Sequence, residues 1–453
     1  MTTVAVLGAG ISGLVAAHRL RRALGSSARI LLVDDAERDG GKLRTVDVGD
    51  VPVDVGAEAF VARRPEMPAL LAELGLSDLL VRPSTTARPL VRSGGSLHAL
   101  PVGTLMGIPA SAESVAHLVD EATVTRIEAE ATTPFRWTPG DDASIGDLVS
   151  ERFGPQVTAR SVDPLLGGVY SGLSVTTGVR AALPGLAAAL DAGATSLTDA
   201  VLRARPAPAP GPVFGGLRGG YRPVLEALAD AADAERVVTR VGSVTTTGAG
   251  WTVDGVGTVD AVVVALPAPA AAAALAAFPA LADHLGAIEL ASSAVVALRF
   301  DGVDLPDNSG VLVATGELRH DGEPLRAKAF TLSSRKWPHL ADRGGDFVRA
   351  SFGRYGDAAI VDEPDDVLID LARRDLADVL GVDAAPAAAV VQRWHGGLPQ
   401  YRPGHLRVVA DVEAAAAELP RLELAGAYLH GVGVPACVAV ASAAAQRTAA
   451  ALA

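Results

Sequence analysis

A glycine-rich segment near the N-terminus carries the clearest chemical signal in the sequence. Its residues are Gly8, Ala9, Gly10, Ile11, Ser12 and Gly13, which match the pattern G-x-G-x-x-G. Residues 3–7 before it read as a buried strand, and 14–24 after it show helical periodicity. In this setting Gly8 permits a tight turn, Gly10 lets a pyrophosphate approach the backbone, and Gly13 allows close packing of helix on strand. The N-terminus of the helix adds unpaired N–H groups and partial positive charge, so the segment predicts a site for dinucleotide phosphates.

An acidic residue at the end of the next predicted strand supports this interpretation. Strand 29–33 is followed by Asp34, which lies 21 residues after Gly13 and close to the spacing of about 20 residues expected for this motif. Its carboxylate can accept hydrogen bonds from ribose hydroxyls and would repel a 2′-phosphate. The alternative is a glycine-rich loop without a ligand. NAD and FAD share the pattern, so it does not choose between them.

Two further segments favour FAD over NAD. Gly41 and Lys42, preceded by another glycine, follow Asp34 at a short distance, and a plain NAD domain has no need for such a turn. The alternative is an ordinary Gly-Gly turn before a strand. At the other end of the chain, the glycine-rich segment 426–435 precedes a helix that we expect to begin near Pro435. The N-terminus of this helix would face the flavin N1/C2=O edge, where reduction places negative charge; the alternative is a turn that only docks the helix.

The composition limits the class of protein. The chain has 453 residues, 49% hydrophobic and 20% charged, which indicates a folded globular protein of two or three domains. Cys437 is the only cysteine and the histidines are scattered, so we expect no disulfide and no metal site. The N-terminus lacks the basic region of a secretory signal, and we expect a cytoplasmic location. The net charge of −13 argues against nucleic-acid binding and means that an anionic substrate would need a local basic pocket.

The order of the predicted elements indicates an α/β protein with a Rossmann-like FAD/NAD(P)-binding domain, a mixed-sheet substrate domain and a helical insertion. The expected boundaries are 1–95, 212–268 and 420–453 for a discontinuous FAD-binding domain, 96–205 for the mostly helical insertion, and 269–419 for the substrate-binding domain. Three predicted strands within 236–266 are expected to form a meander. The Pro/Ala-rich segment 204–212 is expected to be a linker.

Together with several other segments, these motifs resemble the protoporphyrinogen oxidase family, and within it the bacterial coproporphyrinogen III oxidase branch of Gram-positive haem synthesis. The more specific matches are Pro-Leu-Leu-Gly-Gly-Val-Tyr at 164–170 and Arg-Lys-Trp at 335–337. The resemblance implies FAD contacts beyond the glycine motifs. These involve Asp35, Gly56, Ala57, Glu58, Ala59, Val241, Trp394, Ala427, Val432, Gly433 and Val434. Glu58 stands where the eukaryotic enzymes carry an arginine near the flavin, so a role in binding a substrate carboxylate is not transferred to this position.

The activity that the resemblance implies is oxidation of a porphyrinogen, most closely the four-propionate coproporphyrinogen III, to a porphyrin in haem biosynthesis. Three hydride transfers would remove six electrons, and O2 would reoxidise the flavin with formation of three H2O2. The flavin carries the redox step, so no side chain is assigned a catalytic role. Candidates for substrate contacts are Arg63, Arg64, Arg335, Lys336 and Tyr170, against the alternatives of solvated charge and core packing. We also expect that a later enzyme of haem synthesis could be a partner and that any membrane contact is peripheral.

Other functions remain open at this point. A protoporphyrinogen IX oxidase, an amine oxidase or a carotenoid desaturase would have the same fold. An amine oxidase usually carries a lysine and an aromatic cage around the flavin, which four Trp and five Tyr do not make obvious. A flavin-free, lipid-binding escort protein is a further alternative, but the intact Gly8–Gly13, Asp34 and 431–435 segments argue against it.

Overall fold

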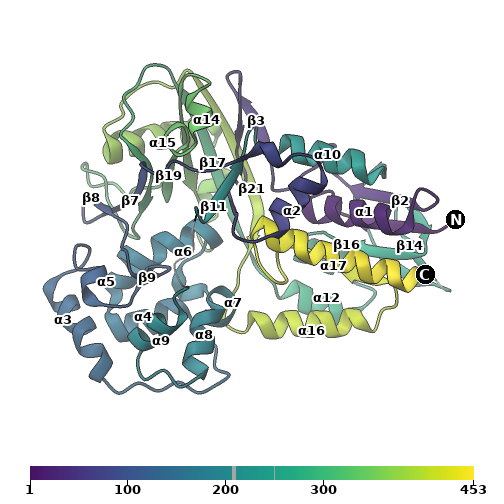
Figure 1. Ribbon diagram of the computed structural model, residues 1–453, viewed down its shortest axis with the longest axis horizontal. Helices are drawn as coiled ribbons and strands as arrows, with labels where there is room; N and C mark the ends of the chain where they lie inside the picture. Colours follow the sequence, from purple (N-terminus) through teal and green to yellow (C-terminus); the bar gives the residue numbers. More distant parts are fainter. Residues whose placement is uncertain (207–210, 249) are drawn as a thin grey trace.

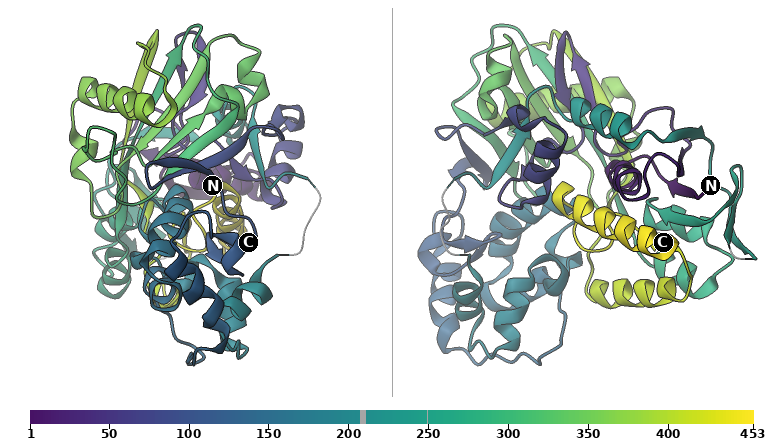
Figure 2. Two further views of the ribbon diagram at one scale, coloured as in Figure 1. Left: turned by 90° about the vertical axis from the view of Figure 1, so that its left-hand side faces the viewer. Right: turned by 45° about the vertical axis from the view of Figure 1, so that its right-hand side comes forward.

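The computed structural model describes residues 1–206, 211–248 and 250–453 (Figures 1 and 2). A five-stranded parallel sheet with the order β12-β2-β1-β16-β22 forms the part of the molecule that holds both termini. Its strands are β1 (Thr3–Leu7), β2 (Arg29–Asp34), β12 (Glu235–Val238), β16 (Ala261–Val264) and β22 (Leu422–Leu424). Residues 4–7 and 261–264 are completely buried. Such central strands are covered on both faces, which explains their unbroken apolar sequences.

Helices from both ends of the chain cover one face of this sheet. Helix α1 (Ile11–Leu24) contacts both α10 (Arg222–Ala232) and α17 (Val434–Leu452), and α2 (Glu66–Glu73) lies against α17. Leu14 and its neighbours on α1 are fully buried in this layer. The first and last helices of the chain are therefore packed side by side (Figure 1).

The opposite face packs against an antiparallel meander and three helices. The elements are β13 (Val244–Thr247), β14 (Gly250–Val253), β15 (Gly257–Val259), α11 (Ala268–Ala274), α12 (Pro279–Gly286) and α16 (His405–Ala417). The meander predicted within 236–266 is wrong at both ends, because β12 and β16 belong to the parallel sheet and β15 is the third meander strand. Short apolar runs reveal that strands form but not which strands pair.

A second sheet of seven strands has the order β21-β17-β20-β19-β18-β7-β8. Its strands are β7 (Arg88–Ser93), β8 (Ser96–Ala99), β17 (Leu290–Phe300), β18 (Asn308–Val313), β19 (Ala329–Leu332), β20 (Asp346–Phe352) and β21 (Ala388–Pro399). Neighbours are antiparallel except β18 and β7, so the predicted mixed sheet is confirmed. Helix α15 (Asp365–Leu380) buries Leu368 and Leu376 against one face.

The helical insertion lies below the large sheet in Figure 1. Its helices are α3 (Glu121–Ala129), α4 (Ile145–Phe153), α5 (Pro155–Val157), α6 (Asp163–Tyr170), α7 (Val179–Ala182), α8 (Pro184–Asp191) and α9 (Leu197–Ala204), with a π-helical turn over Thr158–Val162. They share one apolar core, which includes the fully buried Phe153 and Leu186. This arrangement confirms the expected helical character of the segment.

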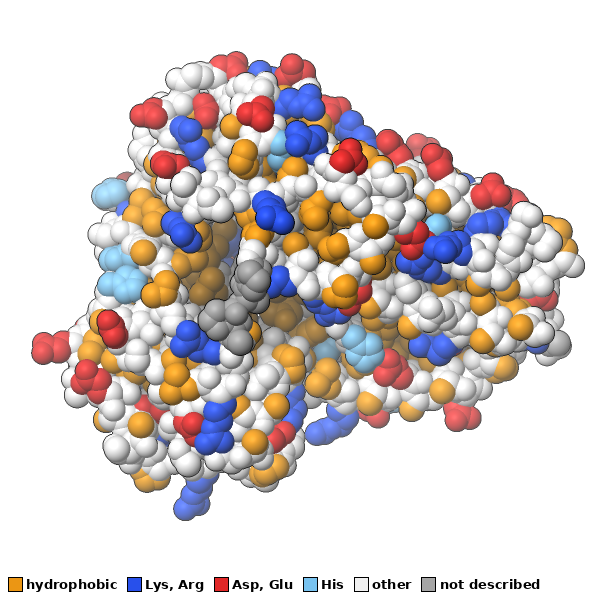
Figure 3. Space-filling model, viewed as in Figure 1, with side chains coloured by type: hydrophobic (Ala, Val, Ile, Leu, Met, Phe, Trp, Pro, Cys, Tyr) orange, Lys and Arg blue, Asp and Glu red, His pale blue; other side chains and the backbone are white. Residues whose placement is uncertain are grey.

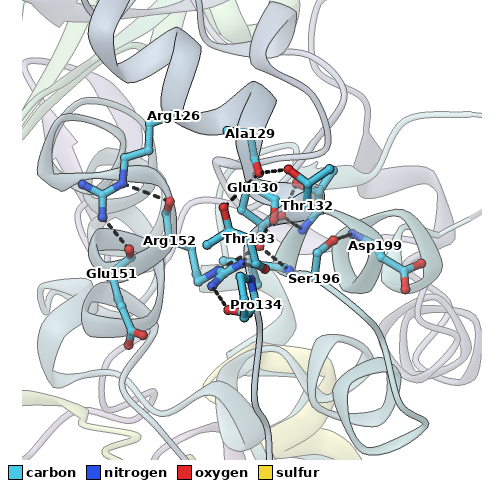
Figure 4. Close-up of polar contacts among 12 residues, drawn as sticks. Arg126, Ala129, Glu130, Thr132, Thr133, Pro134, Glu151, Arg152, Ser196 and Asp199 are labelled. Carbon is cyan, nitrogen blue, oxygen red and sulfur yellow. Dashed lines mark hydrogen bonds and ion pairs between the residues drawn. The ribbon is translucent and has the colours of Figure 1, made fainter.

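A buried ion pair ties the insertion together (Figure 4). Arg152 Nε donates to Glu130 Oε1 over 2.9 Å, and both side chains are almost inaccessible to solvent. The Glu130 carboxylate also accepts hydrogen bonds from the backbone nitrogens of Leu197 and Thr198 at the start of α9. Arg152 further donates to the carbonyl of Thr133. A buried pair with its remaining donors and acceptors engaged is the arrangement in which loss of one partner is most destabilising.

Shorter elements connect these parts. They are β3 (Thr45–Val48), β4 (Val51–Asp54), β5 (Phe60–Val61), β6 (Leu80–Val81), β9 (Thr104–Leu105), β10 (Ile108–Pro109), β11 (Phe214–Leu217), α13 (Ser333–Lys336) and α14 (Pro338–Ala341), with 3-10 turns at Ser77–Leu79, Ala112–Ser114, Glu130–Thr132, Ser174–Thr176 and Ala359–Asp362. Within the described ranges, no helix has the length and hydropathy required to cross a membrane.

The strand pairing bears on the expected domain boundaries. Strand β7 pairs with β18 in the large sheet and β8 pairs with β7, although the expected boundary placed residues up to 95 in the FAD-binding domain. Residues 268–286 and 405–417 pack on the parallel sheet and not on the large one. We propose that residues 88–99 belong to the substrate-binding domain, and that residues 268–286 and 405–417 belong to the FAD-binding domain. The expected linker includes 207–210, which lie outside the described residues.

Candidate functional site

The three glycines of the N-terminal motif occupy different surroundings. Gly8 has φ +105°, and a Cβ there would lie 2.7 Å from the carbonyl oxygen of Ala265. A Cβ on Gly13 would lie 1.8 Å from the carbonyl oxygen of Gly8. By contrast, a Cβ on Gly10 would have the Cα of Gly41, at 3.8 Å, as its nearest atom. Gly8 and Gly13 are thus required by packing, whereas Gly10 leaves space in front of the helix for a ligand.

Asp34 at the end of β2 holds this loop in place. Its Oδ2 accepts a hydrogen bond from the Ala9 backbone nitrogen at 2.7 Å, and its Oδ1 accepts one from Ala36 at 2.9 Å. Each carboxylate oxygen retains a further lone pair. The predicted contact between Asp34 and a ribose stays a prediction, and the neighbouring Asp35 is exposed.

The second glycine segment docks directly on the first. Gly40 donates its backbone N–H to the carbonyl oxygen of Ala9 at 2.8 Å. Gly41 has φ +57°, and a Cβ on it would lie 3.0 Å from the Cα of Gly10. Lys42 follows with an exposed side chain, and no carboxylate among the described residues lies within ion-pair distance of it. An exposed lysine beside this loop suits a phosphate group.

The C-terminal helix begins beside the N-terminal one. α17 begins at Val434, as expected for a start near Pro435, and Gly433 caps it. The Cys437 thiol in its first turn is hydrogen-bonded with Ser12 in the first turn of α1, and Arg19 Nε donates to Ser442 Oγ further along both helices. The two helices therefore run in the same direction with their N-termini together. Their partial positive charges combine near Lys42, which lies in the surroundings of Cys437.

These features fit a dinucleotide that carries a flavin. The open side of Gly10, two adjacent helix N-termini and the Lys42 ammonium offer backbone donors and positive charge to a pyrophosphate. By sequence position, Val432 and Gly433 lie directly before α17, where a flavin ring system would meet its N-terminus. Cys437 itself is buried, as expected for a small core residue.

A tyrosine fixes the loop that leads into α17. Tyr401 donates its hydroxyl to the carbonyl oxygen of Ala427 at 2.7 Å and accepts the backbone N–H of Gly431 at the same distance. Its ring stacks on His405 at 4.0 Å between centroids and lies 5.7 Å from the ring of Tyr170. Tyr401 is the side chain that sequence reasoning missed here, because nothing local to it in the sequence indicates its contact with the segment 427–431.

The segment Gly56–Ala59 follows β4 and contacts Arg349 on strand β20 of the large sheet. A Cβ on Gly56 would lie 2.1 Å from the carbonyl oxygen of Lys42, so the segment packs tightly on the second glycine turn. The carbonyl of Gly56 accepts a hydrogen bond from Arg349 Nη2 at 2.8 Å. The backbone of Gly56, Ala57 and Ala59 thus lies next to the predicted cofactor-binding turn.

Glu58 points away from this surface into a buried polar network. It accepts hydrogen bonds from Lys336 Nζ and Ser333 Oγ, each at 2.8 Å, and lies 3.4 Å from Arg349 Nη1. Burial would raise the pKa of Glu58, but Lys336 and Arg349 outweigh it and lower the pKa to about 2. The Glu58 side chain is therefore an internal counter-ion, and only its backbone is available to the predicted FAD contact.

A small cavity of about 20 Å³ lies beside this network. Asp54, Trp337 and His339 are among its lining residues. Asp54 accepts hydrogen bonds from Thr45 Oγ1 at 2.6 Å and from the backbone nitrogen of Tyr221 at 3.1 Å. Burial raises the pKa of Asp54 to about 7. Two neighbouring carboxyl groups, Asp54 and Glu58, thus have pKa values shifted in opposite directions.

Three further predicted cofactor residues lie on one strand and in two loops. Trp394 on β21 donates its indole N–H to the carbonyl of Val55 at 2.9 Å. Val241 follows β12 and is half-buried. Ala427 lies in the loop held by Tyr401, and its carbonyl is already engaged. Their contacts with FAD stay predictions.

The predicted substrate residues make their hydrogen bonds and ion pairs with different parts of the protein. Arg63 donates to the carbonyl of Gly211, Arg64 pairs with Glu66, and Arg335 donates to the carbonyl of Leu305. Lys336 pairs with Glu58, as described above, so it already has an ion-pair partner within the protein. Tyr170 at the end of α6 is half-buried beside Tyr401. Their roles in substrate binding stay predictions.

Sequence reasoning missed the cations of the large sheet. Arg349 on β20 reaches the Gly56–Ala59 segment, while Lys328 and Arg354 lie where this sheet meets the insertion. A charged residue inside an apolar strand, as Arg349 is within 346–352, was the available signal. Figure 3 shows a hollow between the large sheet and the insertion, with hydrophobic side chains over much of its visible wall. Within the described residues there is no group of three or more His, Cys, Asp or Glu arranged to hold a metal ion.

Comparison with known proteins places this arrangement in a family. The model of the flavin-containing amine oxidoreductases matches residues 11–449. A coproporphyrinogen III oxidase of Mycobacterium tuberculosis is 51% identical over 443 residues, covering 96% of this chain and 95% of the relative. One of Bacillus subtilis is 30% identical over 459 residues, with 96% and 95% covered.

Solved structures agree with this placement. One from Exiguobacterium, named as a protoporphyrinogen oxidase, superposes with a TM-score of 0.86 at 27% identity and covers 99% of both chains. Cyclohexylamine oxidase from Brevibacterium oxydans, at 16% identity and a TM-score of 0.71, shares the fold over 100% of this chain and 99% of its own. The predicted fold class and FAD cofactor are confirmed. The chain belongs to the flavin-containing amine oxidoreductases, in the group that includes the bacterial coproporphyrinogen III oxidases.

Proposed function

We propose that this flavin-dependent oxidoreductase oxidises coproporphyrinogen III to coproporphyrin III in haem biosynthesis. The observation that carries the proposal is the 51% identity to coproporphyrinogen III oxidases along nearly the whole chain. The joined N-termini of α1 and α17 support it, because they supply the flavin site that such an oxidation requires. When bound, FAD supplies the capacity to accept a hydride.

The protein's own contribution is to bind and orient both molecules. The loop Gly8–Gly13 and the turn at Gly41 provide close backbone approach for the cofactor phosphates. Tyr401 fixes the Gly431 loop before α17, and Arg349 fixes Gly56. The hollow between the large sheet and the insertion has the hydrophobic walls that the pyrrole rings of a macrocycle would pack against (Figure 3). Positioning of this kind is how a protein accelerates a step that the cofactor carries.

We propose O2 as the electron acceptor. Oxidation of the porphyrinogen releases six electrons and six protons, which balance the reduction of three O2 to three H2O2. No side chain needs to act as a strong base, because the pyrrole N–H protons can leave to solvent. A cytoplasmic location and contact with a later enzyme of haem synthesis remain part of the proposal.

The test is a substrate comparison on the purified flavoprotein. The fluorescence of the porphyrin product should increase fastest with coproporphyrinogen III and more slowly with protoporphyrinogen IX, and amines should give no product. Three H2O2 should form per porphyrin. Porphyrin formed without H2O2 would exclude O2 as the acceptor. If neither porphyrinogen gave a porphyrin while the protein held FAD, the proposed reaction would be wrong.

A further inference from the structure

Two cations lie at the junction of the large sheet and the helical insertion. Lys328 precedes β19, and its Nζ donates to Ser171 Oγ and to the carbonyl of Gly353, both at 2.6 Å. Ser171 directly follows α6 of the insertion and has φ +50°. Lys328 therefore joins the two parts of the molecule that flank the hollow seen in Figure 3. Both of its acceptors are neutral.

Arg354 lies beside Lys328, and it too has no carboxylate partner among the residues that the structure describes. Its Nη2 contacts the carbonyl of Val313 at 3.5 Å, and its Nε is buried with no hydrogen-bond partner among the described residues. Across residues 1–206, 211–248 and 250–453, no carboxylate lies within ion-pair distance of Lys328 or Arg354. Arg354 is attracted by Asp163 and Asp357 only at longer range.

The nearby carboxylates are engaged elsewhere or exposed. Asp163 accepts hydrogen bonds from the backbone and hydroxyl of Ser174, at 2.9 and 2.6 Å, and from Thr315 Oγ1 at 3.1 Å. Asp357 is exposed. Burial, and then repulsion by Arg354, lower the pKa of Lys328 to about 7. Two adjacent, half-buried cations with no counter-ion among the described residues are unfavourable unless an anion joins them.

The position of the pair connects it with the cofactor site. Tyr170, the residue before Ser171, lies 5.7 Å from the ring of Tyr401 and accepts a hydrogen bond through its carbonyl from Gln400. Tyr401 in turn holds Gly431 in front of α17. A series of contacts through Ser171, Tyr170 and Tyr401 therefore links the cations with the loop before α17. Lys328 and Arg354 are both half-buried, so neither residue is fully enclosed by the protein.

We propose that Lys328 and Arg354 bind a carboxylate of the substrate and so favour a macrocycle that carries carboxylate side chains. This inference rests on the proposed function and extends it by naming the residues that recognise the acid group. A guanidinium can hold a carboxylate in bidentate fashion, and the ammonium has a third donor beyond its two present acceptors.

The experiment measures binding of the product and of its ester to the FAD-loaded protein. Coproporphyrin III and its tetramethyl ester are titrated, in the same detergent, against wild type and the variants Lys328→Gln and Arg354→Gln. Wild type should bind the acid at least about tenfold more tightly than the ester, and each variant should lose about tenfold for the acid alone. Equal binding of acid and ester by wild type would overturn the proposal without any variant.

Two further variants separate charge from structure. Ser171→Ala removes a hydrogen bond of Lys328 but keeps both charges, so its acid affinity should stay within about twofold of wild type. Arg354→Lys should retain much of the discrimination. If the Gln variants weakened acid and ester equally, the pair would be structural only. Because this assay needs no turnover, its failure is distinct from a wild type that does not oxidise coproporphyrinogen III.

Discussion

The hydroxyl of Tyr401 lies 2.7 Å from the backbone nitrogen of Gly431, although the two residues are on different segments that meet in front of α17. The same hydroxyl donates to the carbonyl of Ala427 at 2.7 Å. One phenol thus closes the loop 427–431 through both an N–H and a C=O. That loop leads directly into the helix start at which we place the flavin.

The first prediction tests this closure. Tyr401→Phe leaves the N–H of Gly431 and the carbonyl of Ala427 without their partner, so the loop should lose its fixed shape. We expect FAD affinity to fall about tenfold, in line with about 1–2 kcal/mol for such a loss. FAD binding to the apoprotein, followed by quenching of flavin fluorescence, measures it. Tyr428→Phe is the matched control, because that buried hydroxyl has no partner among the described residues. Equal affinity losses in both variants would contradict the role of Tyr401.

The second prediction separates the glycines of the N-terminal motif. Gly10 has φ −71°, which any residue adopts, and a Cβ there would meet no atom closer than 3.8 Å. Gly10→Ala should therefore fold normally as apoprotein but bind FAD at least about tenfold more weakly, since the methyl group occupies the space for the phosphates. In Gly13→Ala the new Cβ would lie 1.8 Å from the Gly8 carbonyl oxygen, so the apoprotein itself should be destabilised.

Thermal unfolding of the two apoproteins, beside their FAD titrations, distinguishes these outcomes. A Gly10→Ala variant that bound FAD as tightly as wild type would show that no ligand approaches the backbone there. A Gly13→Ala variant as stable as wild type would show that helix and loop are less closely packed than described.

The third prediction concerns the ion pairs of Glu58 with Lys336 and Arg349. Because Lys336 and Arg349 lower the pKa of Glu58 from 4.5 to about 2, the charged carboxylate stabilises the folded state by about 3 kcal/mol above pH 4.5. This contribution is lost as the pH falls from about 4.5 to about 2. Glu58→Gln should therefore be less stable than wild type at pH 7, and the difference should vanish near pH 2.

Urea unfolding across this pH range measures the difference. Glu66→Gln serves as control, since it removes the more exposed pair with Arg64, and such pairs contribute about 0–1 kcal/mol. A pH-independent gap between wild type and Glu58→Gln would mean that lost packing, and not charge, causes the destabilisation.

The fourth prediction has the opposite sign and concerns Asp54. Burial raises its folded-state pKa from 3.8 to about 7, so between these values the folded protein keeps a proton that the unfolded chain releases. This group lowers the free energy of unfolding by about 1.4 kcal/mol per pH unit as the pH rises through the window. In the Asp54→Asn variant, the free energy of unfolding should lack this dependence on pH, which the wild type shows. An unchanged slope between pH 4 and 7 would show that Asp54 is ionised in the folded state.

The sequence determined the local parts of this protein. Strand β1, the loop Gly8–Gly13 and helix α1 are adjacent in the chain, and their geometry follows from glycine conformations and helical periodicity alone. The same holds for the start of α17 near Pro435. These features lie within a few residues of one another, so their chemistry could be predicted without knowledge of the fold.

Only the tertiary structure decided which charges meet. Lys336 was a predicted substrate residue, but it pairs with Glu58, which is 278 residues away along the chain. Lys328 and Arg354 show no distinctive pattern as single residues, yet folding brings both close to α6, with no counter-ion in the described part of the chain. Strands 88–99 joined the large sheet for the same reason: strand pairing and ion pairing depend on contacts between distant segments. Neither an alternating apolar pattern nor a charged residue indicates which distant segment it will contact.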